Sequence, residues 1–71
     1  MDYDGLLREL QKVRKEKRIS LRKLGAELGI SAQALSLIER GKLPLKLREY
    51  CRICESVGVA PSALILKYEK R

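Results

Sequence analysis

The chain has 71 residues, which is enough for one small domain and too few for two. It carries 16 Lys and Arg residues against 9 Asp and Glu residues, so its formal net charge is +7 and its expected partners are polyanions. Histidine and tryptophan are absent and the only aromatic residues are three tyrosines, which removes the commonest general base and metal ligand. An enzyme, a metal site and a cofactor are therefore not expected.

No stretch has the roughly 18 to 20 uninterrupted apolar residues of a membrane span, and charges stand where a signal peptide would be apolar. We therefore expect a cytoplasmic protein with no membrane partner. Cys51 and Cys54 are interpreted as reduced core thiols, because their spacing places both on one face of a helix. A dimer that pools four cysteines around zinc is the disfavoured alternative.

Near the N-terminus, apolar residues recur with helical spacing from Tyr3 to Val13. The pattern predicts a first helix that has Asp2 or Asp4 as its N-cap and ends near Arg18. Its opposite face is either a solvated surface or a surface for a partner. The basic residues of that face are Arg8, Lys12, Arg14, Lys15 and Lys17.

Two short helices follow, each introduced by a serine. Ser20 is the predicted N-cap of a helix over residues 21–28, which Gly29 closes. Ser31 is the predicted N-cap of the next helix, over residues 32–40. Only three residues separate the two helices, so they must cross steeply, as in a helix-turn-helix.

Two more helices complete the predicted fold. An apolar stripe over residues 47–57 ends at Gly58, and Pro61 begins a last helix that we expect to fray from Lys67 to Arg71. The prediction is an all-α protein, a compact bundle of five short helices that forms a single domain over residues 1–71. The helix-turn-helix occupies about residues 20–41, and the last two helices, about residues 46–68, serve the core and dimerisation.

Residues 20–42 resemble the phage-repressor, or Cro-like (Xre-type), helix-turn-helix family. The agreement is strongest at Leu24, at residues 28–31, at Leu35 and Ser36, and at residues 38–42, and it extends over about residues 6 to 66. The resemblance implies a lambda-repressor-like domain that binds double-stranded DNA as a homodimer, with residues 32–40 in the major groove. Gly25 stands where the family prefers alanine, at an expected cost of about 1 kcal/mol in helix propensity.

The family's base-reading positions fall on the outer face of the third helix. The residues at these positions are Ala32, Gln33, Ser36 and Leu37. Gln33 is the favoured direct reader, because a carboxamide pairs with the N6/N7 edge of adenine; the alternative is an ordinary surface glutamine. An outward Leu37 belongs either to the DNA contact or to a protein interface. The residues predicted to hold phosphates are Ser20, Arg22, Lys23, Ser31, Lys42 and Lys46.

Two further groups of residues have predicted structural roles. The resemblance implies that Arg14 and Glu39 form an ion pair between the first and third helices; the alternative is two solvated charges. The expected dimer contacts lie on the last two helices. They are Tyr50, Leu64, Leu66 and Tyr68.

The favoured function is a sequence-specific transcription regulator, a repressor that occupies a palindromic operator. The alternative is a protein-interaction module of the same fold, such as an antitoxin or adaptor, with DNA binding secondary. A regulatory protein partner is left open, because the chain has no room for an effector domain. The third helix has no Arg or Lys before Arg40, so the commonest guanine contact is missing and an A·T-leaning site is expected.

Overall fold

The computed structural model describes residues 1–69 and confirms the all-α prediction for that part of the chain. Its helices are α1 (Tyr3–Glu16), α2 (Leu21–Leu28), α3 (Ala32–Glu39), α4 (Leu47–Val57) and α5 (Pro61–Tyr68). Within the described residues, no helix is both long enough and apolar enough to cross a membrane.

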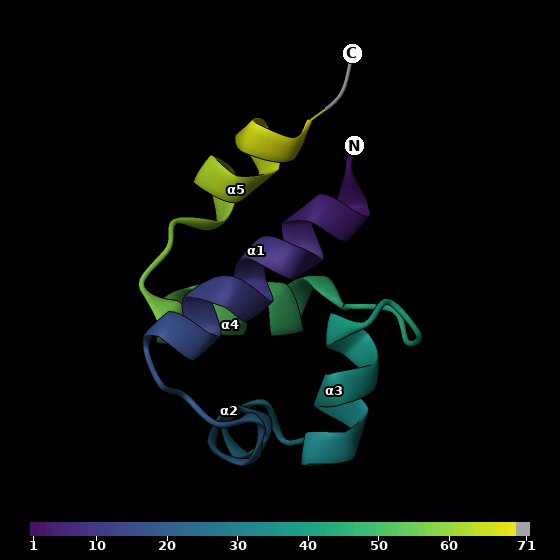
Figure 1. Cartoon of the computed structure of the whole chain (residues 1–71), viewed down its shortest axis with the longest axis vertical. Helices are drawn as coiled ribbons and strands as arrows, with labels where there is room; N and C mark the ends of the chain where they lie inside the picture. Colours follow the sequence, from purple (N-terminus) through teal and green to yellow (C-terminus); the bar gives the residue numbers. More distant parts are fainter. Residues whose placement is uncertain (70–71) are drawn as a thin grey trace.

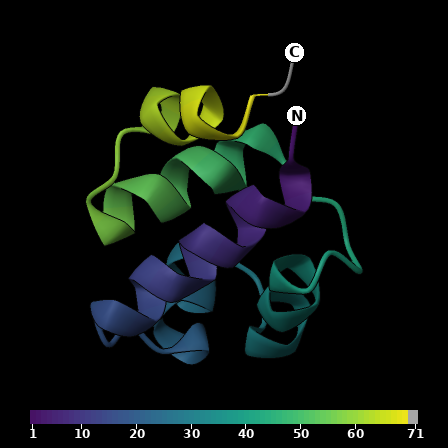
Figure 2. The same ribbon diagram turned by 45° about the horizontal axis from the view of Figure 1, so that its top comes forward.

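The arrangement separates the helix-turn-helix from the last helix. α1 runs diagonally through the middle of the molecule and contacts α3, α4 and α5 (Figure 1). α2 and α3 lie together at one end, and α5 lies beside the N-terminus at the other (Figure 1). The backbone N–H of Asp2 donates to the carbonyl of Tyr68 at 2.7 Å, which fastens that second end. From a different direction, α4 is seen between α1 and α5 (Figure 2).

Short polar side chains cap the starts of α1, α2 and α3, as the sequence predicts. Asp2, rather than Asp4, caps α1, and its carboxylate accepts from the N–H of Gly5 at 3.0 Å. The hydroxyls of Ser20 and Ser31 cap α2 and α3, each accepting a backbone N–H at 3.0 Å. α2 ends at Gly29, whose φ of 75° lies in the left-handed region that glycine adopts without steric cost.

The first helix is shorter than predicted, because it ends at Glu16 and not near Arg18. Arg18 instead adopts φ 59° in the turn that follows. Its N–H donates to the carbonyl of Lys15, and the N–H of Ile19 donates to that of Arg14. These two bonds form a Schellman motif, which glycine usually closes. A non-glycine residue there has a steric penalty of about 1 to 2 kcal/mol.

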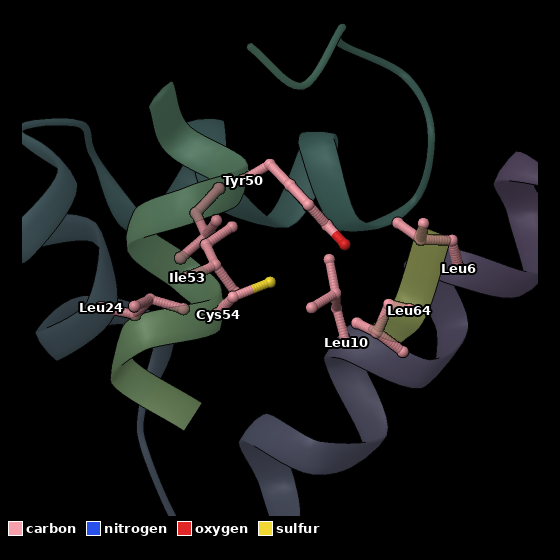
Figure 3. Packing of buried hydrophobic residues seen from close by; sticks show 8 residues of the cluster. Leu6, Leu10, Leu24, Tyr50, Ile53, Cys54 and Leu64 are labelled. Carbon is pink, nitrogen blue, oxygen red and sulfur yellow. The ribbon is translucent and has the colours of Figure 1, made fainter. Parts of the chain in front are cut away.

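Every helix contributes side chains to the central cluster, in which Tyr50, Ile53 and Cys54 of α4 face Leu6 and Leu10 of α1 (Figure 3). Leu35 of α3 belongs to the same buried cluster. The Tyr50 hydroxyl donates to the carbonyl of Pro61 at 2.6 Å, which joins α4 to the start of α5. Burial raises the pKa of both the Tyr50 phenol and the Cys54 thiol, so both remain protonated at neutral pH.

Three predictions about individual residues need correction. Tyr50 and Leu64 were expected at a dimer surface, but both side chains are buried in the core of the single chain. Cys51 was expected in the core, but it is exposed, because it lies at the edge of the apolar face of α4. The predicted fraying is wrong at Lys67 and Tyr68, which are helical. Glu69 has left the helix and has an extended backbone, and residues 70–71 lie outside the described residues.

Candidate nucleic-acid interface

The turn between α2 and α3 brings the two helices into very close contact. It consists of Gly29, Ile30 and Ser31, and the N–H of Ile30 donates to the carbonyl of Gly25 at 2.9 Å. A Cβ atom on Gly25 would lie 2.8 Å from the Ile30 carbonyl oxygen. The two helices can therefore come this close only because residue 25 is a glycine and has no Cβ atom. In Figure 1, α2 is seen end-on while α3 runs up the view, so the helices cross steeply as predicted.

The residues predicted to read bases lie on α3, on the side away from the core. Leu35 and Ile38 are buried and fix the inward face of the helix. Gln33 is exposed and the other predicted readers are half-buried, so Gln33 is the most accessible of the set. The half-buried readers are Ala32, Ser36 and Leu37. A carboxamide offers both a donor and an acceptor, which matches the major-groove edge of adenine.

The starts of α2 and α3 are potential phosphate sites. The first N–H groups of a helix have no partner within the helix, and the helix dipole makes this end attractive to anions. Ser20 and Ser31 are exposed there. Each hydroxyl oxygen accepts a capping bond, which leaves its O–H as a donor for a phosphate oxygen.

Exposed cations stand around these two helices. Arg22 and Lys23 belong to the first turn of α2, and Lys42 and Lys46 belong to the segment between α3 and α4. The N–H of Lys42 donates to the carbonyl of Leu37 at 2.8 Å, which ties this segment to α3. Among residues 1–69, the ion pairs are Arg14 with Glu39 and Lys67 with Glu9. The four cations are therefore available to an external anion.

Arg14 holds the end of α1 to the end of α3. Its Nε atom donates to Glu39 Oε2 at 2.7 Å, and its Nη2 atom donates to Glu39 Oε1 at 3.2 Å. Its Nη1 atom donates to the carbonyl of Ile19 at 2.7 Å, just before α2. The two side chains are only 7% and 8% exposed. One guanidinium therefore connects three segments of the chain and fixes the orientation of α3.

Two features near these helices were not predicted. Glu27 of α2 is bound from α4: its carboxylate accepts from the Ser56 hydroxyl at 2.5 Å, and its carbonyl accepts from Arg52 at 3.4 Å. The left-handed Arg18 places an exposed cation two residues before Ser20. Neither feature has a local sequence signal, because one depends on contacts between distant residues and the other occurs without a glycine.

Within residues 1–69, no group of three or more His, Cys, Asp or Glu side chains comes together in a way that would hold a metal ion. The arrangement is a rigid pair of crossed helices with exposed cations and hydrogen-bond donors, which suits the binding of a polyanion.

A family model described as a helix-turn-helix domain matches residues 6–65. No curated protein and no solved structure matches the chain significantly. The matched residues include all of α2 and α3 and most of the remaining helices. The crossed helices, the three-residue turn and this match lead to one conclusion: the chain belongs to the helix-turn-helix domain family.

Proposed function

We propose that this chain is a sequence-specific transcription regulator that binds double-stranded DNA, a cytoplasmic repressor of the phage-repressor (Xre) type that acts as a homodimer on a palindromic operator. The observation that carries the proposal is the exposed start of α3. There Gln33 points away from the core on a helix whose orientation the Arg14–Glu39 pair fixes. A rigid helix with accessible donors is what base readout in the major groove requires.

Direct readout on this proposal depends on a few side chains of α3. Gln33 pairs with adenine through its carboxamide, and Ser36 adds an adaptable hydrogen bond. Ala32 and Leu37 offer only apolar contact, which suits a thymine methyl group. Because α3 has no Arg or Lys, these contacts favour an A·T-leaning half-site over a G·C-rich one.

Affinity on this proposal comes mainly from phosphates. Arg22, Lys23, Lys42 and Lys46 contact the backbone on both sides of the groove that α3 enters, and the serine caps add hydroxyl and N–H donors. A dimer that neutralises about eight phosphates gives a slope near −7 for log affinity against log salt. Its two half-sites lie about 34 Å apart.

The test is selection of the purified protein against random-sequence duplex DNA at about 50 and 200 mM salt, a range in which phosphate contacts weaken strongly. The proposal expects enrichment of one palindrome at both salt concentrations. Binding at low salt without an enriched sequence would contradict it. That outcome would favour the alternative of a protein-interaction module with secondary DNA binding.

Gln33→Ala sharpens the test, with Gln11→Ala on α1 as the matched control. Loss of direct readout costs about 1 to 3 kcal/mol at a single base position and relaxes specificity there. The control is expected to keep both the affinity and the selected sequence of the native chain. Equal effects of the two substitutions would remove Gln33 from the proposed reading set.

A further inference from the structure

The exposed side of α1 carries a row of cations that neither the core nor the proposed DNA contacts use. Arg8, Lys12 and Lys15 are all exposed, and they recur with spacings of four and three residues. Their side chains therefore leave the helix within about 60° of one another. Of the other basic residues expected on this side, Arg14 is buried and Lys17 lies past the end of the helix. The three exposed residues are called the α1 basic row below.

The α1 basic row is open to solvent. α1 packs against α3, α4 and α5 through its buried side, which includes Leu6 and Leu10. In Figure 1, α1 crosses in front of α4, and no other helix lies in front of α1. The exposed side carries a shallow hollow whose lining comes from α1 alone. The lining residues are Arg8, Gln11, Lys12, Lys15 and Glu16.

The charges of the row are not neutralised within the described chain. Asp4 stands four residues before Arg8, and Glu16 stands four residues after Lys12, a spacing at which ion pairs form along a helix. Among residues 1–69, however, no ion pair includes a member of the row. Like charges three or four residues apart on a helix also repel each other. An external group with negative charges would remove this repulsion.

The chemistry of the row selects an acidic partner. None of the large hydrophobic side chains that are exposed in the described chain lies between Asp4 and Glu16. Binding to this side of α1 must therefore come from charge and hydrogen bonds and not from apolar burial. We infer that the α1 basic row binds an acidic helix of a partner protein, whose Asp or Glu side chains recur every three or four residues. Such a helix, lying alongside α1, places one carboxylate opposite each cation.

The pattern of charge on α1 favours an acidic helix over DNA at this surface. Asp4 and Glu16 are exposed and bound the row at its two ends, about 18 Å apart along the helix axis. A duplex carries unbroken negative charge over a much greater length, so both carboxylates would repel it. A short acidic helix fits between them.

The position of the row also separates it from the proposed DNA contacts. Arg8 and Lys12 line a hollow together with Lys67, near the end of α5. Arg8 lines another hollow together with Arg40, which follows the end of α3. The proposed base contacts use the opposite end of α3, roughly 12 Å away along its axis. The row therefore stays accessible when DNA is bound, a conclusion that rests on the proposed function, and a partner held there would be brought to the operator.

The test uses the full chain, isotope-labelled for NMR, and an alanine-based helical peptide of about 20 residues with glutamates every three or four residues along one face. Titration at about 50 mM NaCl, where surface charges are weakly screened, gives the affinity and the residues contacted. The peptide is expected to shift the amide signals of α1 around the row, both in the free chain and in the chain saturated with its selected duplex. A peptide of the same composition with its glutamates spread around the helix should bind at least about threefold more weakly.

The combined substitutions Arg8→Gln, Lys12→Gln and Lys15→Gln remove the row. Glutamine is a good helix former, so α1 should remain folded, and circular dichroism melting checks this. The variant is expected to bind the matched peptide at least about tenfold more weakly than the native chain. Its affinity for the selected duplex, and the salt slope of that affinity, should be those of the native chain after allowance for the general loss of positive charge.

A matched variant loses the same number of positive charges at the proposed DNA contacts, through Arg22→Gln, Lys23→Gln and Lys42→Gln. It should lose affinity for DNA with a shallower salt slope. Because its total charge equals that of the α1 variant, it shows how much of any loss of peptide binding comes from net charge alone. Its binding of the peptide should stay much closer to that of the native chain.

Several outcomes would overturn the inference. They are the absence of peptide shifts on α1, shifts confined to the starts of α2 and α3, equal binding of the two peptides, and equal loss of peptide binding in the two variants. A larger loss of DNA affinity in the α1 variant than in the matched variant would place DNA on the row and would also overturn it. A chain that binds the peptide on α1 but selects no DNA sequence contradicts the proposed function alone, whereas a chain that selects a palindrome but leaves the row unoccupied contradicts this inference alone.

Discussion

Arg14 and Glu39 are 25 positions apart in the chain, yet their side chains form a two-pronged ion pair whose Nε to Oε2 distance is 2.7 Å. Both side chains are almost completely buried. The same guanidinium also binds the carbonyl of Ile19. The relative positions of α1, α2 and α3 therefore depend on one side chain, and loss of its partner leaves a buried positive charge without compensation.

We expect Glu39→Ala to lower the free energy of unfolding by about 3 to 5 kcal/mol, because the Arg14 charge would be stranded in a buried site. Urea unfolding followed by circular dichroism measures the change. Glu55→Ala removes an exposed glutamate from α4 and serves as the matched control, with an expected change within about 0.5 kcal/mol. An unchanged urea midpoint for Glu39→Ala would show that the pair does not hold the fold.

Gly25→Ala tests the close approach of α2 to the turn. Helix propensity alone predicts a gain of about 1 kcal/mol, because alanine is the better helix former. The added Cβ would meet the carbonyl oxygen of Ile30 at 2.8 Å, so we expect a net loss of about 1 to 3 kcal/mol instead. The neighbouring Ala26→Gly change gives the size of the propensity effect at an exposed position of the same helix. A higher urea midpoint for Gly25→Ala would mean that the turn shifts to make room for the Cβ atom, and it would contradict this prediction.

Much of the fold could be predicted because its signals are local. Ser20 and Ser31 cap the helices that they precede, and Gly29 ends α2, through interactions within a few residues. The apolar stripe of α4 was harder to interpret, because it is wider than the face that the core covers. Tyr50 turned out to be inside and Cys51 outside, and periodicity alone does not show which edge of a wide stripe is buried.

The candidate site could be predicted less completely. The pairing of Arg14 with Glu39 followed from a family resemblance, since two residues so far apart have no local pattern in common. Periodicity placed Gln33 on the outer face of α3, but it does not indicate a nucleic-acid partner. The left-handed conformation of Arg18 could not be predicted from the sequence, because the left-handed residue that follows a helix is usually a glycine.

Arg18→Gly tests why a strained conformation is kept. Glycine adopts a φ of 59° without steric cost, but it also makes the unfolded chain more flexible. We expect the first effect to be the larger, so that the variant is more stable than the native chain by about 0.5 to 1 kcal/mol in free energy of unfolding. Lys17→Gly is the control: Lys17 has φ −81°, so glycine gains nothing there and should destabilise the chain. If the Arg18 side chain binds a phosphate, the substitution also reduces the salt slope of DNA binding by about 0.9 for each phosphate that is no longer neutralised. A lower melting temperature for Arg18→Gly would contradict the strain argument.

Glu9→Gln tests a contact between α1 and α5 that joins residues 59 positions apart. The Tyr68 hydroxyl donates to Glu9 at 2.5 Å and Lys67 lies 2.9 Å away; the hydroxyl first, and then the ammonium, lower the pKa of Glu9 below its ordinary value of 4.5. A lowered carboxyl pKa stabilises the fold above the unfolded value, and that contribution disappears as the pH falls through the folded value. We therefore expect Glu9→Gln to melt slightly below the native chain at pH 7, and we expect this difference to disappear as the pH falls through the folded pKa of Glu9, because the glutamine keeps an acceptor for Tyr68 but not the charge. The difference should be small, since Lys67 is exposed. A gap in melting temperature that persists unchanged in acid would show that the contact does not depend on the ionised carboxylate.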